Sequence, residues 1–170
     1  MMNRLIVFLI SAVISAGAFA GPREASDRPN IIYILADDLG YAELGSYGQK
    51  IIRTPHIDRI AAEGIRFTQH YSGQAVCAPA RCSLMTGMHM GHSFIRDNGN
   101  PKGRVRDDAM SLFPGQNPIP DATVTVAEIL KERGYATAAY GKWGLGYEGS
   151  SGDPLKQGFD DFGGFLCQVQ

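Results

Sequence analysis

The sequence predicts an α/β protein with a mainly parallel sheet flanked by helices. Residues 30–35 form an apolar, β-rich run without polar alternation, which is typical of a parallel strand covered on both faces. A helix pattern over residues 125–134 leads directly into a second apolar run at 135–140, the helix-to-strand succession of a parallel sheet. Glycine accounts for 21 of the 170 residues, which suits a loop-rich α/β protein better than a helical bundle.

The N-terminus has the pattern of a secretory signal peptide. Arg4 precedes an apolar run that starts at Leu5, and small residues lead to an A-x-A site that ends at Ala20. We therefore expect residues 1–20 to be removed, residues 21–29 to form a short polar lead, and the protein to be exported to the periplasm or secreted. The apolar run is short for a stable membrane span, and the net charge of −1 gives no indication of a nucleic-acid partner.

The predicted strand at 30–35 ends in two adjacent acids, Asp37 and Asp38. The carboxyl end of a strand is where open α/β sheets place their ligands. Adjacent carboxylates repel each other, and a bound cation is a natural reason to keep them together. Asp and Gly are also ordinary turn residues, so the residues alone leave a solvated turn and a metal site equally open.

A helix is predicted over residues 55–63. Thr54 is placed to cap it, Pro55 suits the first helical position and Gly64 ends it. Its expected inward face consists of Ile57, Ile60 and Ala61. We expect residues 65–67 to form a short strand after it.

The next helix is predicted to start near Cys77. Pro79 suits a first helical turn and Gly87 can end the helix. Arg81 lies one turn after Cys77 and shares its face. A nucleophile at this position would have free backbone N–H groups and a cation beside it, which favours an anionic substrate. A buried cysteine on a core helix is the structural alternative.

The middle of the chain carries weaker signals. His89 and His92 have a spacing that can converge on one metal ion, but we interpret them as loop histidines and Arg96 as a surface arginine. Three prolines between residues 111 and 121 indicate a loop.

The clearest helix signal is at residues 125–134, where Thr125 and Glu128 form a capping box and Gly134 follows as the stop. Val126, Ile129 and Leu130 are expected to face inward. After the predicted strand at 135–140, Lys142 lies between glycines and can point into a cleft at the same sheet edge as Asp37. Trp143 is expected to be a core aromatic, and no helix or strand is predicted for residues 153–170.

Several of these patterns together resemble the type I sulfatases. The strongest is Cys-x-Pro-x-Arg at 77–81, followed by Leu-x-Thr-Gly at 84–87. Strand-Asp-Asp-x-Gly, Gly-Lys-Trp-x-Leu-Gly at 141–146 and Gly-Phe-Asp-x-Phe-x-Gly at 158–164 also match, so the resemblance covers about residues 30–166. It implies the alkaline phosphatase-like (sulfatase) fold, incomplete here, with residues 30–170 as the N-terminal part of a sulfatase catalytic domain.

The resemblance implies a sulfuric ester hydrolase. In that family a formylglycine-generating enzyme oxidises the cysteine, here Cys77, and a hydroxyl of the hydrated aldehyde attacks the sulfur of a sulfate ester. Arg81 and Lys142 would complete the catalytic set. Asp37, Asp38 and the modified Cys77 would bind Ca²⁺, with Mg²⁺ as a second possibility. The implied substrates are sulfated carbohydrates or aryl sulfates.

The resemblance leaves some features open. Many family members have histidine where this chain has Gly144. Cys82 and Cys167 can pair in an oxidising compartment once Cys77 is converted. We expect a truncated or partial sulfatase that, as the isolated 170-residue chain, binds calcium weakly and does not turn over. The alternatives are a phosphonate or phosphate ester hydrolase of the same superfamily and a non-catalytic secreted remnant.

Overall fold

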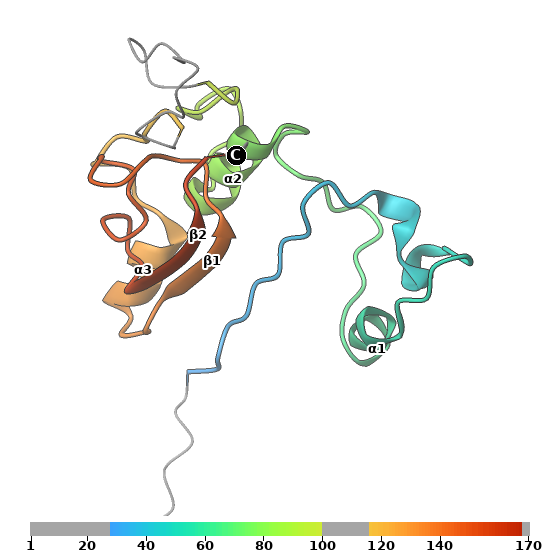
Figure 1. Ribbon diagram of the computed structural model, residues 1–170. Coiled ribbons are helices and arrows are strands. Elements are labelled where there is room, and N and C mark those ends of the chain that lie inside the picture. Colours follow the sequence, from blue (N-terminus) through green and yellow to red (C-terminus); the bar gives the residue numbers. More distant parts are fainter. Residues whose placement is uncertain (1–27, 100–115, 168–170) are drawn as a thin grey trace, which may run out of the picture. The chain divides into compact units, whose positions relative to one another are not determined.

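The computed structural model describes residues 28–99 and 116–167 (Figure 1), so the predicted signal peptide, most of the lead and much of the predicted 111–121 loop lie outside it. The chain divides into residues 1–36 and 37–170. In the described part, no helix is both long and apolar enough to cross a membrane. The elements, in order, are the 3₁₀ helices η1 (Tyr41–Glu43) and η2 (Gly45–Tyr47), the α-helices α1 (Pro55–Glu63), α2 (Cys77–Thr86) and α3 (Val126–Glu132), and the strands β1 (Ala138–Lys142) and β2 (Asp161–Phe165).

The sheet of the described residues consists of β1 and β2, paired in parallel from Ala138 opposite Asp161 to Lys142 opposite Phe165. Its parallel pairing beside helices confirms the predicted α/β class. The strand predicted at 135–140 starts and ends later, so Lys142 is the last residue of β1 and does not follow the strand.

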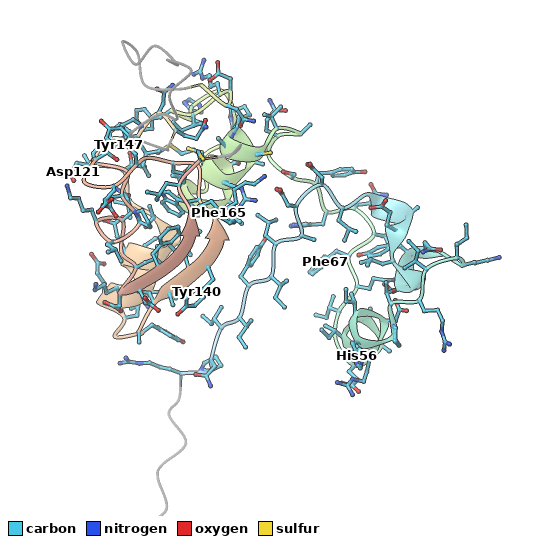
Figure 2. All side chains as sticks on the ribbon, in the orientation of Figure 1. His56, Phe67, Asp121, Tyr140, Tyr147 and Phe165 are labelled. Atoms are coloured by element: carbon cyan, nitrogen blue, oxygen red, sulfur yellow. The ribbon has the colours of Figure 1, made fainter. Side chains whose placement is uncertain are left out.

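Strand β2 was not predicted because its glycines give a poor strand signal. The structure shows why Gly164 belongs there. A Cβ atom at this position would lie 1.9 Å from the Gly141 carbonyl oxygen, so the two strand backbones approach too closely for any side chain. The side chains of Tyr140 and Phe165 extend from this sheet and are 73% and 49% exposed (Figure 2).

The two other strand predictions are wrong. Residues 30–35 are extended but belong to no ladder, and the five apolar side chains from Ile31 to Leu35 are exposed. Residues 65–67 are also exposed and do not pair with any strand of the described residues. A strand is held by backbone hydrogen bonds to a neighbouring strand, and the described part of the first unit contains no second strand. β propensity alone therefore leaves this run extended.

Helix α1 has the predicted bounds but not the predicted contacts. Ile57 and Ile60 are 46% and 63% exposed, so the expected inward face is wrong. Thr54 occupies the N-cap position without capping the helix. Its hydroxyl instead accepts from the Gly45 amide at 2.9 Å and lies 3.1 Å from Asp58 Oδ1. Polar contacts therefore link the start of α1 to η2.

The core of the second unit surrounds Trp143, whose indole N–H donates to the Gly152 carbonyl at 2.7 Å. Its ring meets Phe159 edge to face, with centroids 5.7 Å apart. This confirms Trp143 as a core aromatic. The other members of the cluster come from α2, α3, the segment between them and the loop after β1: Ala78, Cys82, Ile95, Ile119, Ala127 and Leu145.

The capping box of α3 is present as predicted. Thr125 Oγ1 accepts from the Glu128 amide at 3.3 Å, and Glu128 Oε2 accepts from the Thr125 amide at 2.7 Å. The same Thr125 hydroxyl donates to the Gln157 carbonyl at 2.8 Å. The expected inward face is wrong in part, because Val126 and Ile129 are 41% and 48% exposed. Thr125 thus joins the start of α3 to the segment that leads into β2.

We predict that Thr125→Ala lowers the free energy of unfolding by about 2 kcal/mol. The substitution removes a helix cap, typically about 1 kcal/mol, and leaves the buried Gln157 carbonyl without its donor, about 1 kcal/mol more. Urea titration followed by circular dichroism measures the loss. Val124→Ala is the matched control, because Val124 is 59% exposed and its truncation should change stability by less than about 0.5 kcal/mol. Equal effects of the two substitutions would contradict the role of Thr125.

Candidate active site at the start of helix α2

Helix α2 begins at Cys77, as predicted, and closes at Gly87, whose φ of 70° gives the left-handed C-cap that glycine favours. Val76 occupies the N-cap position and cannot cap with its side chain. The Ala80 amide donates to the Val76 carbonyl at 3.0 Å, and Pro79 has no N–H to satisfy. Cys77 is therefore held at the positive end of a ten-residue helix.

Asp37, Arg81 and Lys142 meet in one cluster. Arg81 Nη2 lies 2.9 Å from Asp37 Oδ1, and Lys142 Nζ lies 2.6 Å from Asp37 Oδ2. Arg81 Nη1 also donates to the Lys142 backbone carbonyl at 2.5 Å. The structure thus brings together three of the residues that the sequence patterns single out, although 105 positions separate Asp37 from Lys142.

The contact between Asp37 and Lys142 favours the charged form of both groups. The hydrogen bond from Lys142 is the main cause that lowers the pKa of Asp37; desolvation opposes it, and Arg81 lowers the pKa further. The same hydrogen bond raises the pKa of Lys142. The side chains of Arg81 and Lys142 are 14% and 24% exposed. Arg81 Nε is buried and has no acceptor among the described residues.

Asp37, Asp38 and Cys77 each offer one ligand atom, and the three atoms lie within 4.8 Å of one another. Asp38 has a φ of 57°, a left-handed conformation that Asp tolerates better than most residues. Carboxylate oxygens suit Ca²⁺ and Mg²⁺, whereas a cysteine sulfur is a poor ligand for these hard cations. The donor set therefore fits a hard cation at the two acids, and it fits better if an oxygen replaces the Cys77 sulfur.

The other residues considered from the sequence lie outside this cluster. His89 and His92 are exposed in a turn with ring centroids 4.9 Å apart. Arg96 donates to the carbonyls of Ser93 and Gly91, both at 3.1 Å, as a surface arginine that braces its own loop.

The two remaining cysteines are both buried and remain thiols in the structure, so the possible Cys82–Cys167 disulfide is not formed. Gly144, which occupies the position where many family members have histidine, is buried with a φ of 84°. An ordinary L residue is strained at such a φ, so the backbone here is suited to glycine.

Sequence reasoning missed Asn98. Its side-chain oxygen accepts from the Ala78 amide at 2.9 Å, next to Cys77. A signal was present, because a helix that follows Val76 has no capping side chain of its own and its first amides need an acceptor from elsewhere. The sequence does not indicate which residue supplies it.

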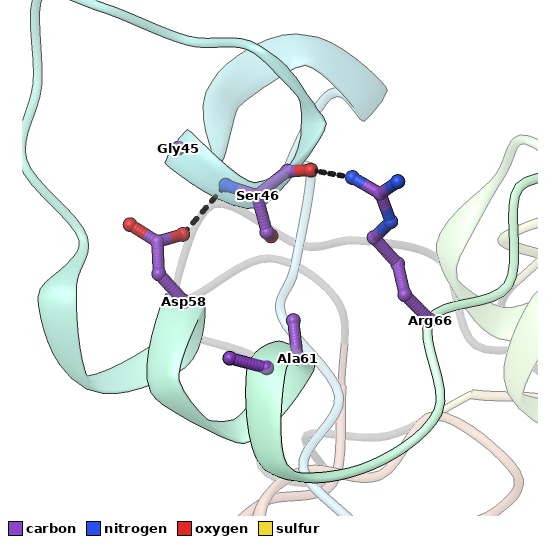
Figure 3. A pocket seen from close by; sticks show the side chains of 6 residues that line it. Gly45, Ser46, Asp58, Ala61 and Arg66 are labelled. Atoms are coloured by element: carbon purple, nitrogen blue, oxygen red, sulfur yellow. Dashed lines mark hydrogen bonds between the residues drawn. The ribbon is translucent and has the colours of Figure 1, made fainter.

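A separate hollow lies beside α1 and η2 (Figure 3). Several of its polar groups already have partners, although the buried Ser46 hydroxyl has none among the described residues. The Ser46 amide donates to Asp58 Oδ1 at 2.6 Å, and Arg66 donates to the Ser46 carbonyl. None of the residues predicted for catalysis or metal binding lines this hollow.

The cysteine, the acid pair and the two cations singled out by the sequence patterns therefore lie close together in the structure. Comparison with known proteins agrees: the Sulfatase family model matches residues 29–167, and the chain belongs to the sulfatase family. It is 43% identical over 149 residues to steryl-sulfatase of Mus musculus, covering 84% of this chain and 22% of that protein. It is 43% identical over 123 residues to N-acetylgalactosamine-6-O-sulfatase of Bacteroides thetaiotaomicron, covering 71% and 21%.

Solved structures give the same result for the fold. The structure of BT33336S-sulf, from work on glycosaminoglycan metabolism by Bacteroides thetaiotaomicron, matches with a TM-score of 0.66 and 35% identity. The match covers 85% of this chain and 29% of that one. This match supports the predicted sulfatase fold class. The chain spans 21% and 22% of the lengths of the two curated relatives above.

We predict that Lys142→Met raises the pKa of Asp37 toward its ordinary value, because the substitution removes the main group that lowers it. NMR titration of the Asp37 carboxyl carbon in EDTA measures the change. Stability from the ion pair is present above the unfolded-state pKa of about 4 and is lost as the pH falls through the lower folded-state pKa, so the variant should lose less stability on acidification.

Lys131→Met is the matched control for this substitution. Lys131 Nζ lies 2.6 Å from Asp160 Oδ1 and is the main cause that lowers the pKa of Asp160. The control should therefore move the titration of Asp160 and leave that of Asp37 unchanged. An Asp37 titration that both substitutions shift alike would show that its pKa does not depend on the contact with Lys142.

Proposed function

We propose that the protein hydrolyses sulfate esters through Cys77 converted to formylglycine, with a divalent cation held at Asp37 and Asp38. The observation that carries the proposal is the position of Cys77. It lies at the start of α2 within 4.8 Å of two carboxylates, one turn from Arg81 and beside the cluster that contains Lys142. A thiol is the wrong ligand for a hard cation at this place, and an oxygen-bearing residue is the right one.

Each group has a role that follows from its contacts. One hydroxyl of hydrated formylglycine at position 77 would attack the sulfur and displace the alcohol of the ester. Loss of the proton of the second hydroxyl would then re-form the aldehyde and break the C–O bond to the sulfate, which leaves. Arg81 and Lys142 face the same carboxylate and carry fixed positive charge, so they stabilise negative charge that develops on the sulfate oxygens. Asp37 keeps both cations oriented through its two oxygens.

The two aspartates would hold the cation. Calcium takes six to eight oxygen ligands, and Asp37, Asp38 and a modified residue 77 offer part of that shell. When bound, the cation would polarise the sulfate ester and offset the repulsion between the adjacent acids. We propose Ca²⁺ as the ion because carboxylates in a flexible, incomplete set suit it, with Mg²⁺ as the alternative.

The substrate class we propose is sulfated carbohydrate or aryl sulfate. Relatives named for N-acetylgalactosamine-6-sulfate and for steryl sulfate match this chain at the same identity of 43%, so identity does not separate sugar from hydrophobic alcohol. We also propose maturation by a formylglycine-generating enzyme and export, supported by the Cys-x-Pro-x-Arg segment and by the pattern of residues 1–20.

The modification has a direct test. In a host with a formylglycine-generating system, mass spectrometry should find an aldehyde at Cys77 and an intact thiol at Cys82. Cys82 lies five positions away outside the recognised segment, so it is an internal control that reacts with a thiol reagent when denatured. A full thiol at Cys77 in such a host would remove the proposed mechanism. Sulfate release should be lost in Cys77→Ala, and equal turnover of an aryl phosphonate would favour the alternative hydrolase.

The metal site is tested by Asp38→Asn. Asn tolerates the left-handed φ of 57° as well as Asp does, so the turn is kept and only the charge is removed. In the complete protein, we expect the variant to bind Ca²⁺ at least about tenfold more weakly by calorimetry, because fewer anionic oxygens remain. Asp121→Asn, in an exposed turn away from the cluster, is the control. Unchanged calcium affinity in Asp38→Asn would exclude Asp38 as a ligand.

A further inference from the structure

The segment that follows α2 runs back along the helix and is attached to it at two points. Ser93 is buried, and its hydroxyl oxygen lies within hydrogen-bond distance of Cys82 Sγ, at 3.2 Å. Asn98 Oδ1 then accepts from the Ala78 amide at 2.9 Å. From the first contact to the second, the residue number increases by five in the segment (Ser93 to Asn98) and decreases by four in the helix (Cys82 to Ala78). The segment therefore lies antiparallel to the first two turns of α2 and ends beside Cys77.

Asn98 supplies what the local sequence of the helix lacks. The N-cap residue Val76 offers no side-chain acceptor. Ala78 is fully buried, so its amide would be a buried donor without a partner if Asn98 were removed, which is costly. The neighbouring position, Pro79, has no N–H to compete for the same oxygen.

The orientation of the Asn98 amide is fixed by chemistry. A backbone N–H only donates, so the group that faces Ala78 has to be the side-chain oxygen and not the nitrogen. The loop around it is also anchored. The Gly99 amide donates to Asp97 Oδ1 at 2.9 Å, and the Asn117 amide donates to the Gly99 carbonyl at 3.1 Å.

We propose that Asn98 is a positioning residue for residue 77: its hydrogen bond to the Ala78 amide fixes the first turn of α2 and thereby sets the nucleophile against Arg81. This inference rests on the proposed function for its effect on turnover. It does not require Asn98 to touch the substrate, because the side chain acts through the helix backbone.

The structural part of the proposal is tested by amide hydrogen exchange at Ala78 in the complete protein. Asn98→Ala should make this amide exchange about fivefold faster, the factor typical of a lost N-cap. Asn98→Asp should keep the protection, because a carboxylate accepts the same hydrogen bond at a helix N-terminus. Ser93→Ala removes the other attachment point and should leave exchange at Ala78 within about twofold of the wild type, since Ser93 contacts the next turn.

Turnover of an aryl sulfate by protein with residue 77 converted separates positioning from simple stability. We expect Asn98→Ala to lower kcat about tenfold or more with KM nearly unchanged, because a misplaced nucleophile loses rate and not ground-state binding. Asn98→Asp should restore kcat to near the wild-type value and raise KM, since its carboxylate repels the anionic ester.

Two results would overturn the proposal. One is wild-type exchange at Ala78 in Asn98→Ala. The other is an Asn98→Asp protein that protects Ala78 but has a kcat as low as that of Asn98→Ala, because the side chain would then act through its own amide. If the wild-type protein releases no sulfate, the proposed function fails, and the exchange data still decide whether Asn98 fixes the turn.

Discussion

The contact on which the site depends is the carboxylate of Asp37 between two cations. Each of its oxygens faces one positive group, Arg81 at 2.9 Å and Lys142 at 2.6 Å. The three residues belong to a loop, a helix and a strand, so one carboxylate fixes where these elements meet. The two cations are partly buried, with side chains 14% and 24% exposed, whereas the Asp37 side chain is 41% exposed. The pairing therefore holds the geometry of the cluster and favours the charged forms of Asp37 and Lys142.

Apolar packing between α2 and the residues after β1 supports this contact. Ala78 and Cys82 on the inner side of α2 are fully buried in the same cluster as Trp143 and Leu145, which directly follow β1. Arg81 lies on the adjacent face and reaches the Lys142 carbonyl at 2.5 Å. The helix that carries the nucleophile and the strand that carries the lysine are thus held by apolar packing and a polar contact together. A site on two such elements is better defined than one on loops alone.

What the sequence predicted well were features with a local cause. Proline near the start and glycine at the end predicted the bounds of α1 and α2. The capping box of Thr125 and Glu128 predicted α3. The predictions that failed depend on partners distant in the chain. An apolar run such as 30–35 becomes a strand only beside another strand. The exposed Ile57 and Ile60 show that apolar residues at helical spacing do not indicate which element, if any, covers them. Asn98 was missed because its partner, Ala78, lies 20 positions away. The site motifs could be recognised in the sequence because their chemistry needs particular residue types. The distances between those residues could not be predicted, because they depend on the fold.

The left-handed backbone of Asp38 makes the two adjacent acids differ in the substitutions that they can tolerate. Position 37 needs a carboxylate that reaches two cations, while position 38 needs a carboxylate on a backbone with a φ of 57°. Asn and Gly can replace Asp38 without backbone strain but discard the charge. Glu retains the charge but lacks the short side chain that makes this conformation tolerable. None of these three substitutions at position 38 therefore keeps both the charge and an unstrained turn.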